Sequence, residues 1–342
     1  MRRVARLHRF NILIYLIDIV DLPKVYSVFQ MMYRIEEKVI AVLLKIAKKV
    51  SGHDLIISIP AVWIFLFFIC PCLILIQISF SESIISSPPY TSIVDWISGN
   101  ILQVRLNLWN YMVLLTDEMY RQGLFTSLLI AATSTFCCLL IGFPMAYAIA
   151  RTSEKYRNIL LMLVVLPFWT SFLIRVYAWI MLLSPCGFVN NMLIKFQLID
   201  APLPLMNNSF AACIGIIYAY LPFMIFPLYS AVEKIDYSLI EAAYDLGSSP
   251  ATAFFSIVVP LSAPGIYAGS ALVFVPAIGE FVIPELLGGA QTLTIGRLVW
   301  NEFFGNMSWP TAASLSIMLL VFVVLPIIFA QKRRELRLLS RD

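Results

Sequence analysis

Charged residues are scarce in this sequence. Of its 342 residues only 13% are Asp, Glu, Lys or Arg, whereas 61% are hydrophobic and the mean hydropathy is +0.87. A soluble domain carries about 25% charged residues. A soluble chain of this length could not bury so much apolar surface in one core, because surface area falls too slowly with size. The composition therefore excludes an ordinary soluble protein and indicates that much of the apolar surface faces lipid.

Signals of catalysis and of metal binding are missing as well. The chain has two histidines, His8 and His53, and no GxxxxGK[ST] phosphate loop, which an ATP-hydrolysing subunit would need. Its six cysteines form no CxxC pair and give no support to a zinc or redox site, so we expect them to be small packing residues. The sequence therefore predicts neither an enzyme nor a metal protein, and no nucleic-acid partner.

Six stretches nearly free of charge are long enough to cross a bilayer, which takes roughly 20 apolar residues in a helix. They are residues 55–81, 122–150, 159–194 (interrupted by Arg175), 201–232, 246–279 and 303–331. The stretches are continuously apolar rather than alternating, which excludes transmembrane strands. The sequence predicts an all-α polytopic membrane protein with six helices near 57–80, 124–150, 159–183, 209–232, 264–284 and 312–330.

Basic residues set the expected orientation. If both termini are cytoplasmic, nineteen Lys and Arg residues fall inside and four outside, and Arg175 lies within a helix. This positive-inside pattern predicts a basic cytoplasmic tail at 1–54, a transmembrane domain at 55–331 and a second basic tail at 332–342. It also places residues 233–263, between the fourth and fifth helices, in the cytoplasm.

The N-terminal tail has few distinctive signals. Residues 33–50 place apolar and charged side chains at helical spacing, which suits either the anionic inner leaflet or a solvated tail. Because Asp18 and Asp21 interrupt the first apolar run, we expect no cleaved signal peptide. Met31 and Met32 leave a second translation start open.

The 233–263 loop is the most informative segment. Ser238 and Glu241 have the spacing of a capping box, which predicts a helix start, and Gly247 suits the left-handed residue that ends one. Ser249 and Pro250 predict a second short helix that ends before Pro260. The loop is then either a docking element for a partner or a plain connector in which Glu241 is only a cap.

The loop resembles a known family. Glu241-Ala242-Ala243, then Gly247, Ile257 and Pro260 match the EAA loop of bacterial binding-protein-dependent ABC importers, with Val259 where leucine usually stands. The resemblance implies that these six residues sit in a groove of an ATPase subunit and carry its motion to the spans.

Further segments resemble the polyamine branch of that family, and putrescine permeases in particular. They are residues 134–138, 170–179 and 279–289, and the likeness covers roughly 55–330. It implies a multi-pass protein of the bacterial inner membrane that imports polyamines, putrescine foremost. It also implies partners: a second homologous permease, two copies of an ATPase that binds ATP and Mg, and a periplasmic substrate-binding protein. No cofactor is expected in this chain.

Charges inside the membrane are costly, so they are candidates for function. We expect Glu280 to line the substrate path, where a carboxylate could hold an ammonium group, although a salt bridge to Arg175 or a helix-end bond would also explain it. Trp169 is the aromatic candidate for the same path, against a place in the interfacial belt. Arg175, which would repel a polyamine, is expected to pair with a carboxylate or with backbone carbonyls, and Glu285 to be structural.

Other interpretations remain open at this level. An ion-coupled secondary transporter acting alone would predict inverted repeats, of which no convincing example is found. A membrane-anchored assembly or sensor protein is a further alternative. Importers of sulfate, molybdate or iron share the EAA loop, so the substrate could also be another small solute.

Overall fold

The computed structural model describes residues 52–92, 94–97, 101–104 and 106–339. Most of the predicted N-terminal tail, including its stretch 33–50, lies outside these residues, as do residues 340–342 of the predicted C-terminal tail. The chain divides into two compact units, Met1–Cys72 and Leu73–Asp342. The described residues are mostly helical in both units, which confirms the predicted helical class.

The first unit contributes one helical stretch. It consists of α3 (Gly52–Ile64), the π-helical turn η2 (Phe65–Ile69) and the start of α4 (Cys70–Ser79), which continues into the second unit. Residues Ser58–Ser79 are long and apolar enough to cross a membrane. Large apolar side chains such as Trp63, Phe67 and Phe68 are exposed, as expected of a surface that faces lipid.

The second unit begins with a short hairpin that the all-helical prediction missed. Strands β1 (Val94–Ile97) and β2 (Ile101–Val104) pair antiparallel, with Val94 opposite Val104 and Ile97 opposite Ile101. The strands are rich in Val and Ile, and the sequence between them is Ser-Gly-Asn, which are turn-forming residue types. A strand of four residues gives only a weak sequence pattern, which is easily missed beside apolar runs of 20 residues or more.

The elements that follow the hairpin in the second unit are all helices or helical turns within the described residues. Its elements are α5 (Trp109–Thr116), α6 (Glu118–Arg151), α7 (Glu154–Val165), the 3-10 turn η3 (Leu166–Trp169), α8 (Phe172–Leu183), α9 (Phe188–Lys195), α10 (Ser209–Glu233), α11 (Ser238–Asp245), α12 (Pro250–Ala253), the π-helical turn η4 (Phe254–Val258), α13 (Val259–Leu261), α14 (Ala263–Ile278), α15 (Val282–Leu287), α16 (Ile295–Trp300), the π-helical turn η5 (Asn301–Gly305) and α17 (Trp309–Leu339).

Five helical stretches of the described chain could cross a membrane by length and composition, or six if a bent pair is one span. The five are Ser58–Ser79, Glu118–Arg151, Phe172–Lys195, Ser209–Glu233 and Trp309–Pro326. The bent pair is Pro250–Leu261 with Ala263–Ile278, which meet at 67°. The predicted multi-pass helical architecture is therefore confirmed. The predicted second, fourth and sixth helices correspond to α6, α10 and α17.

The predicted third helix, 159–183, is wrong as a single helix. The chain forms α7, then η3 with Pro167 near its start, and Thr170 and Ser171 are extended before α8 begins. Proline has no N–H for the carbonyl four residues earlier and its ring crowds that carbonyl, so it disfavours a continuous α-helix. The apolar run crosses this break without any change in composition, which is why hydropathy did not detect it.

The predicted fifth helix, 264–284, is also divided. α14 ends at Ile278, and α15 begins at Val282. The Glu280 carboxylate accepts hydrogen bonds from the backbone N–H groups of Val282 and Ile283, so it starts the new helix.

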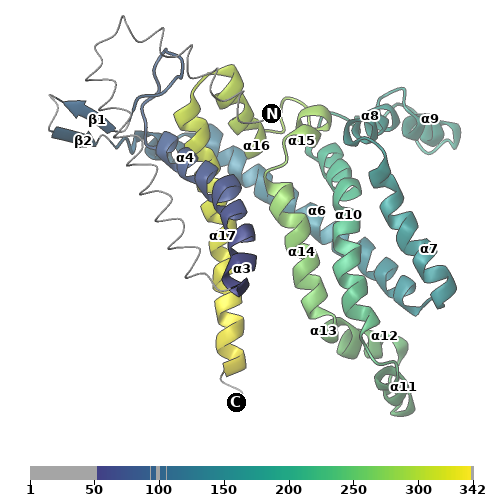
Figure 1. Cartoon of the computed structure of the whole chain (residues 1–342). Helices are drawn as coiled ribbons and strands as arrows, with labels where there is room; N and C mark the ends of the chain where they lie inside the picture. The colour runs from purple at the N-terminus through teal and green to yellow at the C-terminus, as the bar shows by residue number, and fades with distance from the viewer. Residues whose placement is uncertain (1–51, 93, 98–100, 105, 340–342) are drawn as a thin grey trace, which may run out of the picture. The chain divides into compact units, whose positions relative to one another are not determined.

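Helices α6, α10 and α14 contact one another at close range, and Figure 1 shows them side by side. Gly265 and Gly269 of α14 make this possible. A Cβ on Gly265 would lie 2.6 Å from the Ala231 Cβ, and one on Gly269 would lie 2.8 Å from the Met224 Sδ. Gly265 and Gly269 therefore let the helices approach closely, as small residues at this spacing can.

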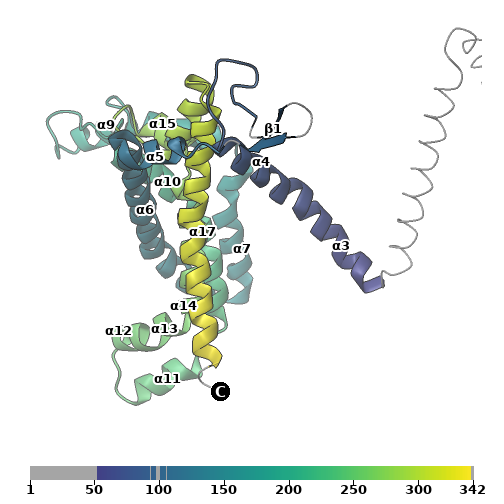
Figure 2. The ribbon, with the colours of Figure 1, turned by 90° about the vertical axis from the view of Figure 1, so that its left-hand side faces the viewer.

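The 233–263 loop packs on the same three helices. In both Figure 1 and Figure 2, α11 and α12 lie together at one end of α10 and α14, and α15 lies at the other end. One buried cluster joins the loop to the spans: Phe143, Ala146 and Ile149 of α6, Met224, Ile225 and Leu228 of α10, and Ile240, Ala243, Ala253 and Val258 of the loop. The loop and the spans therefore share a core.

Candidate functional site

The first loop helix, α11, begins at Ser238 as predicted, but the capping group is different. Ser238 is the first helical residue rather than the cap, so it does not form the predicted box with Glu241. Tyr237 occupies the capping position, and Asp236 before it accepts a hydrogen bond at its Oδ1 from the Ser238 N–H at 3.0 Å. Hydrogen bonds from the Ser238 backbone and side chain hold the pKa of the Asp236 carboxyl below its usual range. Asp, like Ser, is a residue type that commonly bonds the first N–H groups of a helix.

Gly247 ends α11 in the way the sequence predicted. Its φ is +82°, in the left-handed region that glycine adopts without strain. The Gly247 N–H bonds to the Tyr244 carbonyl and the Ser248 N–H to the Ala243 carbonyl, both at 2.9 Å. This pair of bonds is the Schellman arrangement, which satisfies the last carbonyls of the helix and turns the chain sharply.

The second loop helix starts as predicted and ends later than predicted. The Ser249 Oγ accepts a hydrogen bond from the Thr252 N–H, and Pro250 occupies the first turn. The helix then passes Pro260 and reaches Leu261. The π-helical turn η4 ends two residues before Pro260 and widens the helix where the proline would otherwise crowd the Ser256 carbonyl.

The two loop helices have one face in the core and another that is open. Ile240 and Ala243 of α11 are buried, and so are Ala253 and Val258 that follow. On the open side, Leu239 and Leu246 are exposed, Leu246 by 88%. Glu241 and Ala242 are exposed beside them.

The six predicted coupling residues therefore fall into three groups. Glu241, Ala242 and Pro260 are exposed, Ala243 and Ile257 pack toward the core, and Gly247 makes the turn. Phe254 makes edge-to-face contacts with Phe143 and Tyr147 of α6, with ring centroids 5.3 and 5.6 Å apart. A displacement of the loop would therefore press on α6 through a ring contact as well as on α10 and α14.

Glu280 lies half-buried between α14 and α15. One carboxylate oxygen, Oε1, accepts from the Val282 N–H at 3.1 Å and the Ile283 N–H at 3.4 Å, and Oε2 accepts from the Tyr220 hydroxyl of α10. This is the helix-end bond that the sequence left open as an alternative to a path role. The Tyr220 hydroxyl and the two backbone N–H groups together fix the orientation of the carboxylate.

Trp169 and Arg175 flank the break between η3 and α8. The Trp169 side chain is 70% exposed. The Arg175 guanidinium carbon lies 4.9 Å from the Phe168 ring centroid and 5.7 Å from that of Phe172. In the described part of the chain, Arg175 Nε and Nη1 are buried without a hydrogen-bond partner, so the predicted carboxylate or carbonyl pairing of these atoms is wrong. Aromatic faces take that place, and in an apolar setting they attract a cation.

Glu285 forms an ion pair with Arg297. Its Oε2 lies 2.6 Å from the Arg297 Nε, and Arg297 Nη1 also donates to the Gly289 carbonyl at 2.7 Å. The pair links α15 to α16.

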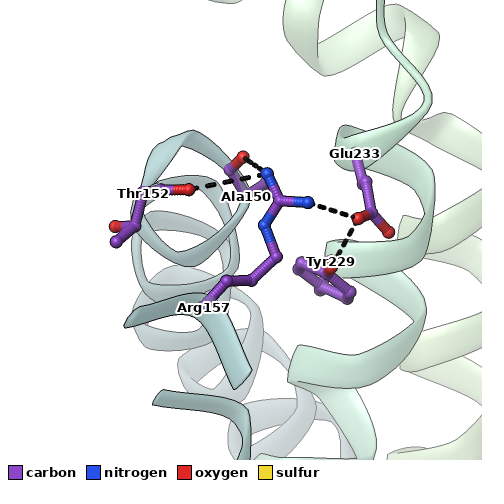
Figure 3. A network of polar contacts seen from close by, with 5 residues as sticks. All are labelled: Ala150, Thr152, Arg157, Tyr229 and Glu233. Atoms are coloured by element: carbon purple, nitrogen blue, oxygen red, sulfur yellow. Dashed lines mark hydrogen bonds and ion pairs between the residues drawn. The ribbon is translucent and has the colours of Figure 1, made fainter. Parts of the chain in front are cut away.

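Two polar groups escaped the sequence analysis. Glu302 in η5 is only 6% exposed and accepts hydrogen bonds from the Tyr120 hydroxyl at 2.9 Å and the Asn306 side chain at 3.0 Å. Arg157 in α7 forms an ion pair with Glu233 of α10, shown in Figure 3. Tyr120 lies 182 residues from Glu302 and Arg157 lies 76 residues from Glu233, so no local pattern could have paired them.

Comparisons with known proteins agree with this geometry. The family model described as binding-protein-dependent transport system inner membrane component matches residues 138–337, a range that includes α10 to α16. The spermidine/putrescine transport system permease protein PotB of Haemophilus influenzae is 39% identical over 279 residues, which cover 82% of this chain and 92% of that protein. The protein of the same name from Escherichia coli is 41% identical over 231 residues, covering 68% and 84%.

A solved structure shares the fold. A chain from the crystal structure of a bacterial ABC transporter involved in the import of the acidic polysaccharide alginate superposes with a TM-score of 0.59. It is 20% identical, and the match covers 88% of this chain and 98% of that chain. At that identity the likeness concerns the fold alone.

Proposed function

Because the chain belongs to the family of binding-protein-dependent transport system inner membrane components, we propose that it is the permease subunit of an ATP-driven importer of polyamines, with putrescine as the foremost substrate. The family and the apolar helices make it a multi-pass protein of the inner membrane. The observation that carries the proposed substrate class is the 39% identity to a spermidine/putrescine permease over 92% of that protein's length.

In this proposal the 233–263 loop docks into a partner ATPase. The exposed side of α11, with Leu239, Glu241, Ala242 and Leu246, is the docking face. The buried side, with Ile240 and Ala243, joins the spans. The partner ATPase, present in two copies, binds ATP and Mg, and this chain itself lacks a GxxxxGK[ST] phosphate loop. A second homologous permease and a periplasmic binding protein complete the complex, and this chain is non-catalytic.

The substrate path is proposed to include Glu280 and Trp169. A half-buried carboxylate and an exposed aromatic face both attract ammonium groups. Arg175 and Glu285 are assigned to structure, because the first stacks on phenylalanine rings and the second pairs with Arg297. Because Glu280 also accepts hydrogen bonds from the first N–H groups of α15, a cation bound to it would weaken those bonds and so affect how α15 follows α14.

Uptake of labelled putrescine tests this function. Vesicles that contain the full reconstituted complex, with ATP at the cytoplasmic face, should accumulate putrescine only when ATP is present. Gly247→Pro should abolish both uptake and binding of the ATPase, because proline cannot adopt a φ of +82°. ATP-independent uptake, or a Gly247→Pro variant that behaves like wild type, would favour a secondary transporter.

The path assignment needs a separate variant. Glu280→Gln removes the charge and leaves one acceptor oxygen where the carboxylate has two, so uptake should fall at least tenfold while the ATPase still assembles. Glu285→Gln is the matched control and should keep most of the uptake. Competition by unlabelled spermidine, sulfate and molybdate identifies the solute class, and uptake blocked by sulfate rather than by spermidine would contradict the polyamine assignment.

A further inference from the structure

The turn between α6 and α7 is tied to α10 by one side chain. Figure 3 shows the Arg157 guanidinium between Glu233 on one side and two carbonyls on the other. Nη1 lies 2.9 Å from the Glu233 Oε1, and Nη2 donates to the carbonyls of Ala150 at 3.2 Å and Thr152 at 3.5 Å. The last carbonyls of a helix have no partner within it. Arg157 therefore satisfies the end of α6 while it binds the last residue of α10.

A second arginine, Arg151, contacts the residue that precedes α11. The guanidinium carbon of Arg151, the last residue of α6, lies 5.3 Å from the Tyr147 ring centroid and 4.8 Å from that of Tyr237. In the described chain, Arg151 Nε and Nη2 are buried without a hydrogen-bond partner, so the rings are its main contacts. Tyr237 immediately precedes α11, and Arg151 therefore joins α6 to the start of that helix.

Residues 233–237 link α10 to α11. Arg157 contacts the first residue of this link, and Arg151 contacts the last. Glu233 at its start is held by Arg157 and also accepts a hydrogen bond from the Tyr229 hydroxyl at 2.6 Å. Ile235 in its middle is buried in the core shared by the loop and the spans. Tyr237 at its end lies against Arg151. The link is thus attached at its start, middle and end, and it cannot bend freely when α11 is displaced.

We infer that Arg151 and Arg157 are positioning residues for energy coupling, which make the α6–α7 turn move together with α11 so that an ATP-driven displacement of α11 reaches α6. This inference rests on the proposed function. Without the two contacts the 233–237 link would act as a pivot, and part of the displacement would be lost in bending it. The Arg157–Glu233 pair is partly exposed, with side-chain exposures of 24% and 39%, so it adds little to folding stability. Its removal should therefore alter coupling while the fold and the assembly remain.

The ratio of ATP hydrolysed to putrescine imported distinguishes coupling from folding. In vesicles with the full complex, a Glu233→Ala plus Tyr237→Leu double variant should raise this ratio at least threefold, with unchanged co-purification of the ATPase. A purely structural role would lower hydrolysis and uptake together and leave the ratio at the wild-type value, which would overturn the inference.

Two controls are matched to the contacts. Tyr237→Phe keeps the ring beside Arg151, and Lys155→Gln removes a charge from the same turn, and both should keep the wild-type ratio.

A second measurement does not depend on transport. Hydrogen exchange of the full complex is followed with and without a non-hydrolysable ATP analogue and Mg. In wild type the analogue should change amide exchange both in α11 and in residues 150–157; in the double variant only the change in α11 should remain. A change at 150–157 that persists in the variant, or that is missing in wild type, refutes the inference. If wild-type vesicles import no polyamine, the proposed substrate is wrong, and this exchange pattern still decides the coupling role.

Discussion

Three glutamates, Glu233, Glu280 and Glu302, each accept a hydrogen bond from a tyrosine hydroxyl. Burying a carboxylate in apolar surroundings is costly unless hydrogen bonds compensate for the lost water. A phenol supplies such a bond without adding a charge, and it brings a ring that packs against the neighbouring helices. The bond matters most for Glu280 and Glu302, which are half-buried and buried, whereas Glu233 is exposed and also has an ion pair with Arg157 in the described chain.

Glycine packing gives a prediction at the same scale. Gly265→Val should destabilise the protein by about 1–3 kcal/mol, the usual cost of forcing extra atoms into a packed site. The added side chain would meet the Pro227 carbonyl and the Ala231 Cβ, both 2.6 Å from the position of a new Cβ, and the backbone cannot give way as a flexible side chain would. Thermal unfolding of the purified protein in detergent measures the loss.

Gly305 offers a matched control for that prediction. No atom lies within 4 Å of the position that a Cβ on Gly305 would take. Gly305→Ala should therefore leave the unfolding temperature nearly unchanged. Equal losses in the two variants would mean that the close contact between α10 and α14 is absent in the membrane-bound protein.

At the scale of the element, prolines divide apolar runs that hydropathy reads as continuous. Pro167 lies in η3 at the break between α7 and α8, and Pro260 follows the π-helical turn η4. Proline removes one backbone hydrogen bond each time, and the chain responds either with an extended break or with a widened turn. In the 233–263 loop the second response keeps the helix going to Leu261, where it meets α14 at 67°. The bend gives the loop helices their direction across the end of α14.

The turn at Gly247 gives a prediction for the loop as a unit. Gly247→Ala should weaken the loop by about 1–2 kcal/mol, because an L-residue with a side chain is strained in the left-handed region. Space is not the cause, since nothing lies within 4 Å of the new Cβ. Gly247→Asn should lose less, because asparagine tolerates this conformation better than alanine. Co-purification of the ATPase with each variant measures the effect, and the order wild type, Asn, Ala is expected. Equal binding by all three would argue against Gly247 as the residue that sets the docking turn.

At the scale of the whole molecule, exposed apolar side chains and basic residues occupy different parts of the chain. Apolar side chains are exposed over many helices of the described chain, where lipid can cover them. Basic residues gather in the tails and in the loops that the positive-inside pattern assigns to the cytoplasm. The proposed docking face and the two arginines of the α6–α7 turn belong to that same predicted side.

Cysteine accessibility tests the predicted orientation. In a variant whose six native cysteines are alanine, Lys155→Cys should react with a membrane-impermeant maleimide only after the cells are opened, because we expect it to face the cytoplasm. Asp200→Cys should react in cells whose outer membrane alone has been permeabilised. The reverse labelling would mean that the protein is inserted with its termini outside and that the 233–263 loop cannot reach a cytoplasmic ATPase.

The sequence by itself determined the features that depend on local chemistry. Long apolar runs dictate helical spans because backbone groups in lipid must bond within their own segment. Gly247 and the Ser249-Pro250 pair dictate the turn of the loop, because each acts through its own backbone within a few residues. The EAA pattern belongs to the same class, and it was enough to indicate the family.

Only the tertiary structure decided which polar groups meet. Glu280 caps α15 and accepts from Tyr220, Arg175 lies on phenylalanine rings rather than against a carboxylate, and Arg157 joins α6 to Glu233. These partners come from separate helices or from a break within an apolar run. Such pairings depend on how the helices pack, and packing is the sum of many weak contacts that no local pattern records.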